Sequence, residues 1–243
     1  MKKMLALFDL QIPHQINLKP VFDYQKDLKP DILVFGGDIL DCEALQGYRN
    51  RTPQSVDWDE IHEEIKQCNV ILDQADGISP KAEKHFWMGN HEERLTDFIE
   101  TYPKFKSIVP NLVKELHLRE RGYRVHGQHE LVRFGKLWVY HGDYYGTFHT
   151  RKNVYDYERN LLYGHVHAPQ MYTKVNPITE EPHQSHCAPC LCDKNPVWLE
   201  GKPNAWVNGF TTVFFQDNGH YNLYMTNIIK GKCVAPNGKE YVG

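Results

Sequence analysis

Five short clusters of oxygen- and nitrogen-bearing side chains have the composition of a metal site. They occupy residues 9–11, 37–41, 89–92, 141–143 and 164–167, and their candidate ligands are Asp9, Gln11, Asp38, Asn90, His141, His165 and His167. This mixed set of carboxylates, amides and imidazoles suits Mn, Fe, Zn or Ni. Only a carboxylate can offer one oxygen to each of two ions, and Asp38 stands where it could do so. Glycines beside four of the clusters let the backbone turn sharply and approach a phosphate.

The elements around the clusters predict that they meet. Residues 4–8, 31–35 and 85–88 are short apolar runs typical of strands, and residues 56–75 and 92–101 have the apolar spacing of amphipathic helices. Each cluster follows a predicted strand. Because side chains at the carboxyl ends of neighbouring strands project into one crevice, an α/β fold would bring the five clusters together.

A change after Gly122 indicates a second sheet. Residues 123–126, 130–134, 136–140, 161–163 and 170–175 are predicted strands, and residues 210–215 are expected to pair with residues 221–229 across the Asn218-Gly219 turn. We expect a single domain over residues 1–243 that includes this C-terminal hairpin. Residues 176–204 are rich in Pro, Cys and His and lack periodicity, so they predict a long loop.

In their order and residue patterns, the clusters resemble the motifs of the calcineurin-like metallophosphoesterase superfamily, which run D-x-H, G-D-x-x-D, G-N-H-[DE], [GA]-H-[GDS] and G-H-x-H. The resemblance covers residues 9–167, about two thirds of the chain. It implies an α/β fold with a two-sheet β-sandwich flanked by helices and the site at the strand ends. It also implies a first metal held by Asp9, residue 11, Asp38 and His167, and a second held by Asp38, Asn90, His141 and His165.

The sequence departs from the family pattern at Gln11, which replaces a histidine. An amide oxygen still binds a hard cation but is a weaker ligand than an imidazole, so the first metal is expected to bind less tightly. His14 lies three residues further on and could substitute for it. Pro13 fixes the backbone between them, which favours an unrelated loop histidine.

The expected chemistry is phosphoester hydrolysis. Two cations roughly 3.5–4 Å apart would lower the pKa of a bridging water and provide hydroxide for in-line attack on phosphorus. Asp38 and His91 are the predicted catalytic residues, with His91 as general acid toward the leaving group that the resemblance places beside it. Asn90, His91 and Arg94 are candidate substrate contacts, although a solvated helix charge is the favoured interpretation of Arg94. Of the metals, Mn²⁺ is expected first, with Fe, Zn or Ni as alternatives.

The substrate is predicted only by class. Ser/Thr protein phosphatases would require Arg-Gly after Asp41, where this chain has Cys42-Glu43, so a phosphoprotein is disfavoured. Nucleotides, nucleic-acid ends and small phosphoesters remain. Six aromatic residues could stack on bases, although most aromatic residues fill cores: Trp58, Trp87, Tyr144, Tyr145, Phe148 and Tyr172. A metal-dependent nuclease and a catalytically weak scaffold of the same fold are the alternatives, and Gln11 is the single sign of the latter.

The Cys/His-rich segment is a second candidate metal site. His183, His186, Cys187, Cys190 and Cys192 include a C-x-x-C and could bind a structural zinc, but no second C-x-x-C pairs with it, which favours a packed loop.

Composition indicates a reducing, cytoplasmic setting. Six cysteines in 243 residues are too sparse for a disulfide scaffold, and the apolar run after Met-Lys-Lys stops at Asp9. No stretch predicts a membrane span. The formal charge of −3 provides no global basic field for nucleic acid, although a local groove could still be positive.

Overall fold

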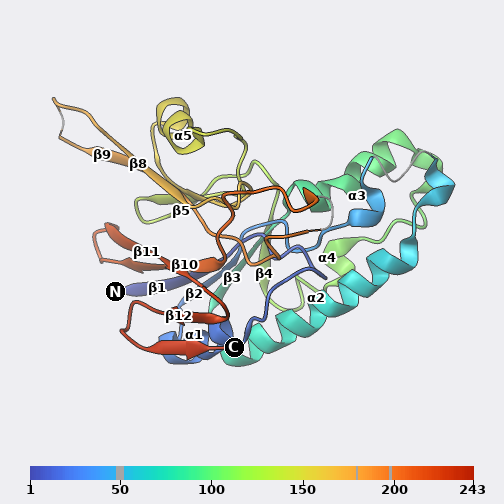
Figure 1. Cartoon of the computed structure of the whole chain (residues 1–243), viewed down its shortest axis with the longest axis horizontal. Coiled ribbons are helices and arrows are strands. Elements are labelled where there is room, and N and C mark those ends of the chain that lie inside the picture. Colours follow the sequence, from blue (N-terminus) through green and yellow to red (C-terminus); the bar gives the residue numbers. More distant parts are fainter. Residues whose placement is uncertain (48–51, 179, 197–198) are drawn as a thin grey trace.

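Two β-sheets stacked face to face form the centre of the protein (Figure 1). The computed structural model describes residues 1–47, 52–178, 180–196 and 199–243. The first sheet has the order β11-β10-β1-β2-β3-β4. Its strands are β1 (Lys2–Leu7), β2 (Ile32–Phe35), β3 (Glu83–Trp87), β4 (Tyr123–His126), β10 (Gly209–Phe215) and β11 (Tyr221–Asn227). Strands β1 to β4 are parallel, and β10 pairs with β1 in the antiparallel sense.

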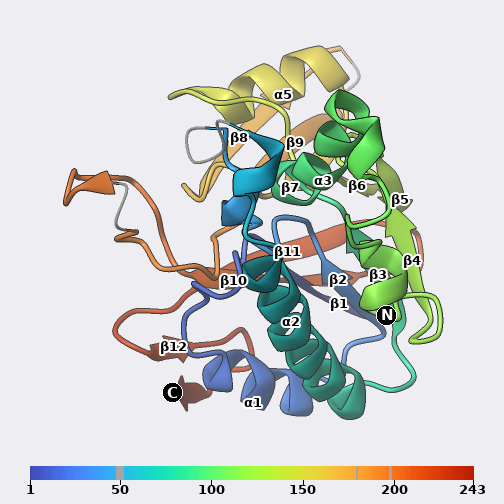
Figure 2. The ribbon, with the colours of Figure 1, turned by 90° about the vertical axis from the view of Figure 1, so that its right-hand side faces the viewer.

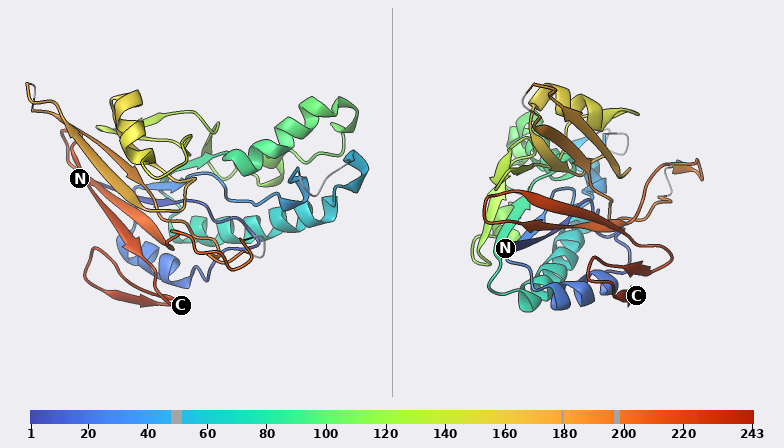
Figure 3. Two further views of the ribbon diagram at one scale, coloured as in Figure 1. Left: turned by 45° about the horizontal axis from the view of Figure 1, so that its top comes forward. Right: turned by 90° about the vertical axis from the view of Figure 1, so that its left-hand side faces the viewer.

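The second sheet has the order β5-β6-β7-β9-β8. Its strands are β5 (Val132–Phe134), β6 (Leu137–Val139), β7 (Asn160–Tyr163), β8 (Gln170–Val175) and β9 (Pro182–Cys187). Strands β6, β7 and β9 are parallel. Figure 3 shows β8 and β9 as a long antiparallel pair at one end of the molecule.

Helices cover the outer faces of both sheets. The first sheet is covered by α1 (Lys19–Leu28), α2 (Trp58–Ile78) and α3 (Asn90–Thr101), and Figure 2 shows α2 in front of it. The second sheet is covered by α5 (His149–Tyr157), which packs on β8 and β9. The remaining elements are α4 (Leu112–Glu115), 3-10 turns at Glu43–Leu45, Pro53–Ser55 and Pro103–Phe105, and a hairpin of β12 (Lys232–Val234) and β13 (Glu240–Val242). None of the described helices is long and apolar enough to cross a membrane.

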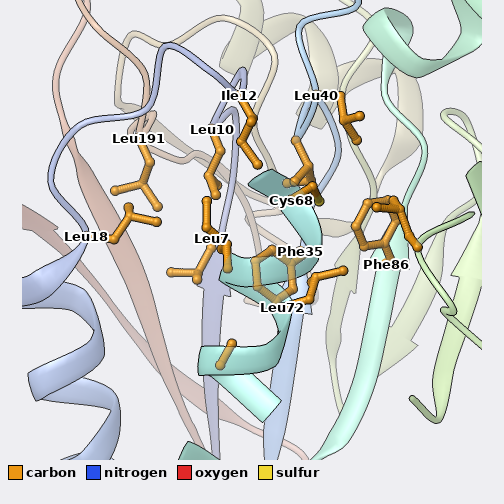
Figure 4. Close-up of a cluster of buried hydrophobic side chains, with 14 of the residues drawn as sticks. Leu7, Leu10, Ile12, Leu18, Phe35, Leu40, Cys68, Leu72, Phe86 and Leu191 are labelled. Carbon is orange, nitrogen blue, oxygen red and sulfur yellow. The ribbon is translucent and has the colours of Figure 1, made fainter. Parts of the chain in front are cut away.

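Strand alternation divides the core into two layers. In β1, Leu5 and Leu7 face the helices, whereas Met4 and Ala6 face the second sheet. This is the two-residue period of a strand that is buried on both faces. Figure 4 shows the helix-side layer, where Leu7 and Phe35 meet Leu72 of α2. All of these side chains are fully buried or nearly so, which fixes the register of β1 and hence the position of the residues that follow it.

The predicted fold class, a two-sheet sandwich flanked by helices, is confirmed. Two predictions about its parts are wrong. Residues 123–126 form β4 of the first sheet, because Tyr123 packs on Phe35 and Phe86 of that layer. Residues 182–187, expected within a loop, form β9, whose polar sequence hides its strand character although Ser185 and His186 are buried. The hairpin of β10 and β11 is confirmed.

Candidate metal centre

The five clusters meet at one end of the stacked sheets. Asp9, Asp38 and Asn90 follow the parallel strands β1, β2 and β3, while His141 follows β6 and His165 follows β7. Because parallel strands end at the same edge, each sheet delivers its side chains to the same crevice. The convergence predicted from the sequence is therefore present in the structure.

Two groups of potential ligands share Asp38. The first contains Asp9, Asp38 and His167, and the second contains Asp38, His141 and His165; within each group the ligand atoms all lie within 4.8 Å of one another. Asp38 Oδ2 lies 3.3 Å from His141 Nε2, and Asp9 Oδ1 lies 3.4 Å from His167 Nε2. All five side chains are buried, so the cluster is held away from bulk solvent.

The two amide residues lie beside these groups in different ways. Asn90 begins α3, and its Oδ1 is 2.7 Å from His165 Nδ1 and 3.1 Å from His141 Nε2. The Gln11 side chain lines the same cavity, with Nε2 3.5 Å from His91 Nε2. His14 instead lies 3.6 Å from an oxygen of Asp41 and 3.5 Å from one of Glu43, in a group separate from both Asp9 and Asp38. Gln11 thus lines the cavity that contains both groups, whereas His14 does not.

The buried imidazole nitrogens give one sign that a cation fits the site. The Nε2 atoms of His165 and His167 are buried and make no hydrogen bond with any described residue. A buried polar atom without a partner costs about 1–3 kcal/mol. His167 Nε2 lies in the first group, 3.4 Å from Asp9 Oδ1, where a divalent cation would satisfy it. His165 instead turns Nδ1 toward Asn90 and the second group. The donor set of oxygen and imidazole nitrogen therefore fits borderline divalent metals.

The backbone of the site is strained at five of the seven candidate ligands. Positive φ angles occur at Asp9 (53°), Gln11 (47°), Asp38 (49°), His165 (68°) and His167 (62°). A residue with a side chain pays of order 1–3 kcal/mol for such a conformation, and such residues cluster at functional sites. Strain at this density is expected where side-chain position matters more than local stability.

Glycine allows two of the loops to approach each other. A Cβ atom on Gly89 would lie 2.2 Å from Asp38 Oδ1, and one on Gly164 would lie 2.5 Å from Asp9 Oδ2. Neither distance is compatible with a side chain. The close approach explains why glycine precedes both Asn90 and His165.

Glu92 holds the Asp38 loop in place, a role that the sequence interpretation missed. Its buried carboxylate accepts hydrogen bonds from the backbone N–H groups of Asp38 (3.1 Å), Ile39 (2.7 Å) and Leu40 (2.9 Å), and from Gly89 (2.7 Å). The bond to Gly89 is the return half of a capping box, so Glu three residues after a helix N-cap was the available signal. Burial and the neighbouring Asp38 raise the pKa of Glu92, and these backbone donors oppose that rise.

The imidazoles differ in protonation. Burial alone would lower the pKa of His141 and His167, but the carboxylates of Asp38 and Asp9 outweigh it and raise those pKa values to about 10 and about 9. Burial lowers the pKa of His165 to about 4. His141 Nδ1 donates to the Gly36 carbonyl, 2.9 Å away, which directs Nε2 toward Asp38. Without cations, protons on His141 and His167 balance the buried carboxylates.

His91 and Arg94 both contact Asp41. His91 Nδ1 lies 2.6 Å from Asp41 Oδ1 and 2.8 Å from its carbonyl oxygen, and Nε2 lies 3.7 Å from Asp38 Oδ2. Burial lowers the pKa of His91, but the carboxylates of Asp38 and Asp41 raise it by a larger amount. The pKa of His91 therefore lies above its usual value. Arg94 donates to the Asp41 carbonyl at 2.7 Å and lines the cavity. Arg94 is thus hydrogen-bonded within the protein, which corrects its interpretation from the sequence as a solvated helix charge.

The candidate ligands open into a cavity of about 480 Å³. Tyr145 packs on His165 with 4.5 Å between ring centroids and 55° between the ring planes, and Trp206 meets His167 edge-on at 4.3 Å. Two of the other predicted stacking residues behave differently: Trp87 is fully buried in the core, and Trp58 packs on Phe98. A hollow of similar size, about 500 Å³, lies beside Arg133 and contains none of the ligands, so volume alone does not identify the site.

Comparisons with known proteins give a distant likeness of fold. No protein-family model matches the chain, and no curated protein sequence matches it. Among solved structures, Vps29 of Chaetomium thermophilum is 11% identical with a TM-score of 0.47, covering 100% of this chain and 96% of that one. A conserved uncharacterized protein of Streptococcus pneumoniae, described as a predicted phosphoesterase, is 12% identical with a TM-score of 0.38, covering 100% and 98%. Likenesses this remote carry no information about activity.

Replacing Glu92 by Gln is expected to destabilise the protein by about 2–4 kcal/mol, because an amide has one acceptor oxygen for four backbone donors and buried charged partners are costly to lose. Urea unfolding followed by far-UV circular dichroism measures this loss. Glu93→Gln, in the same helical turn and outside the loop contacts, is the matched control and is expected to change stability by less than about 0.5 kcal/mol. Equal stability of the two variants would contradict the loop-holding role.

Cation binding at pH 7 is expected to release about two protons, because His141 and His167 are protonated below their raised pKa values and must free Nε2 to bind an ion. Apparent affinity should therefore rise with pH up to about 9–10. A pH indicator in weakly buffered protein titrated with Mn²⁺ measures the release. At saturating Mn²⁺, the His141→Ala variant should release about one proton fewer than the wild type, and the His165→Ala variant should release the same number. Release of almost no protons by the wild type would contradict the assignment.

Proposed function

We propose that this chain is a calcineurin-like metallophosphoesterase that hydrolyses phosphoesters with two divalent metal ions. The observation that carries the proposal is the sharing of Asp38 between two groups of buried ligands, the first of which includes His167 Nε2, a buried nitrogen without a hydrogen-bond partner among the described residues. In this proposal Asp9, Gln11, Asp38 and His167 hold the first ion, and Asp38, Asn90, His141 and His165 hold the second. Bound there, Mn²⁺ or another borderline divalent ion would neutralise phosphoryl oxygens and lower the pKa of a water.

His91 is the proposed general acid. Asp41 accepts from Nδ1 and fixes the ring, so Nε2 is the nitrogen that can donate toward the cavity. Its proton would pass to the leaving oxygen as the phosphorus–oxygen bond breaks. Arg94 holds the Asp41 backbone and lies at the cavity wall, where its remaining donors can contact a phosphate oxygen.

The proposed substrate is a phosphoester that carries an aromatic group, such as a nucleotide or a nucleic-acid end. Tyr145 and Trp206 line the cavity next to His165 and His167, one beside each proposed ion. Stacking of a base on such a ring contributes about 1–3 kcal/mol and tolerates any base. The near-neutral charge balance of the chain gives no comparable support to the alternative of a nuclease that follows a long polynucleotide.

The proposal predicts hydrolysis that chelators abolish and Mn²⁺ restores. We expect this with bis-p-nitrophenyl phosphate, p-nitrophenyl phosphate, cyclic nucleotides and short single-stranded DNA assayed side by side, with nucleotide substrates showing the lowest KM. Asp38→Asn removes the shared charged ligand and should lower kcat/KM by at least about 100-fold, the upper range for losing even a supporting residue of a metal site. Failure of the folded, Mn²⁺-loaded protein on every substrate would favour a scaffold, and preference for DNA over the small diester would favour a nuclease.

Replacing His91 by Asn is expected to preserve both metals and to reduce kcat for alkyl esters by about 10²–10⁴-fold, the usual contribution of general acid catalysis. Esters of p-nitrophenol, whose leaving group needs no proton, should lose much less. Metal content by mass spectrometry and kcat on the two ester types measure both effects. A uniform loss across leaving groups would remove the role of proton donor from His91.

A further inference from the structure

A second cluster with metal-ligand chemistry lies behind the proposed centre. His167, Cys190 and Cys192 are buried, and their ligand atoms all lie within 4.8 Å of one another. Cys187, the first residue of the C-x-x-C, lies outside this group and directs its thiol toward the carbonyls of Gly164 and Ala188. The zinc set predicted from the sequence includes Cys190 and Cys192, together with Cys187, His183 and His186, but does not include His167.

The backbone places both thiols on one side of an extended segment. Cys190 is bridged to Asn208 and Cys192 to Gln15, so residues 190–192 lie between two other chain segments. Leu191, between the cysteines, points the other way into the helix-side core, where Figure 4 shows it near Leu18. Alternation along an extended chain then directs the two sulfurs to the opposite side.

His167 presents a different nitrogen to each of its neighbours. Nε2 lies 3.4 Å from Asp9 Oδ1, on the side of the proposed centre, whereas Nδ1 lies 3.7 Å from Cys192 Sγ. In a tetrahedral zinc site with Zn–S about 2.3 Å and Zn–N about 2.0–2.1 Å, sulfur and nitrogen are separated by about 3.6 Å. The observed separation needs almost no adjustment to admit an ion between them.

From this geometry we infer that His167, Cys190 and Cys192 form a site for a thiophilic divalent ion such as Zn²⁺ or Cd²⁺, and that this site shares His167 with the proposed metal centre. Two thiolates and an imidazole select soft and borderline ions over Mn²⁺ or Mg²⁺. Asn208 Nδ2, which lies 3.7 Å from Cys190 Sγ and donates to the Cys192 carbonyl at 2.6 Å, supports the sulfur side of the site.

The shared imidazole makes the two sites compete. A neutral imidazole has one nitrogen lone pair, so a ring whose Nδ1 binds a thiophilic ion carries its proton on Nε2. Nε2 is then no longer a ligand of the first hard cation, which binds more weakly through its remaining ligands. The inference predicts inhibition by thiophilic ions without displacement of the second cation, which does not use His167. The predicted competition and inhibition rest on the proposed function, whereas the thiolate site itself does not.

Cadmium titration of the full chain tests the thiolate site. Thiolate-to-cadmium charge transfer absorbs in the near ultraviolet, while carboxylate and imidazole ligands give no such band, so the signal reports only sulfur ligation. We expect one Cd²⁺ per chain to produce the band in the presence of excess Mn²⁺. The band should disappear in Cys190→Ser/Cys192→Ser and persist in the matched control Cys187→Ser, after equilibration long enough for a buried site to fill.

A band retained in Cys190→Ser/Cys192→Ser, or absent from the wild type, would overturn the site. Should that variant fail to fold by circular dichroism, X-ray absorption of the wild-type cadmium form counts its sulfur ligands without any substitution: two are expected, and fewer would overturn the inference. Free Mn²⁺ measured by electron paramagnetic resonance tests the sharing, with one of two Mn²⁺ expected to bind about 10–100-fold more weakly when Cd²⁺ is present. A cadmium band with unchanged Mn²⁺ affinity would disprove the sharing and leave the phosphoesterase proposal intact.

Discussion

The buried carboxylate of Asp38 is the constraint on which the rest of the site depends. Burial would raise the pKa of this group, but the charges of His141 and His91 hold it well below its usual range. An ionised carboxylate in the interior is tolerated only with such partners or with metals. The surrounding structure follows from this requirement: His141 approaches one oxygen, the His91 backbone N–H donates to the other at 2.9 Å, and Glu92 anchors the loop behind it.

The two sheets make distinct chemical contributions to the centre. Of the seven candidate ligands, the carboxylates and amides follow strands of the first sheet, and the imidazoles follow strands of the second. The site therefore exists only while the sheets are packed on each other. Its geometry is set by the apolar layer between them, in which Ala6, Val34 and Leu162 are fully buried.

Much of this arrangement could be predicted from the sequence because its signals are local. Asp9, Asp38 and His165 each follow an apolar run short enough to be a strand, and strand ends of one sheet converge by geometry. The sheet membership of residues 123–126 was not predictable in the same way, since it depends on pairing with β3 and on contacts of Tyr123 with Phe35 and Phe86. Contacts between residues far apart in the chain also decide the roles of Glu92, of Trp206 and of the pair of Cys192 with His167. Local sequence spacing does not predict such contacts.

Positive φ angles at five candidate ligands connect the geometry of the site with the stability of the fold. The strain at Asp9, Asp38 and His167 opposes folding and must be offset by the packing on either side. Cations that bind the folded state alone would add RT ln(1 + [L]/Kd) of stability for each site. Because the ligands come from both sheets, that contribution would act across the sheet interface. The same ions would neutralise the buried carboxylates, whose charge is balanced by protons on His141 and His167 when no ion is bound. The cluster of candidate ligands thus joins the two halves of the sandwich, and its geometry depends on the docking of the sheets.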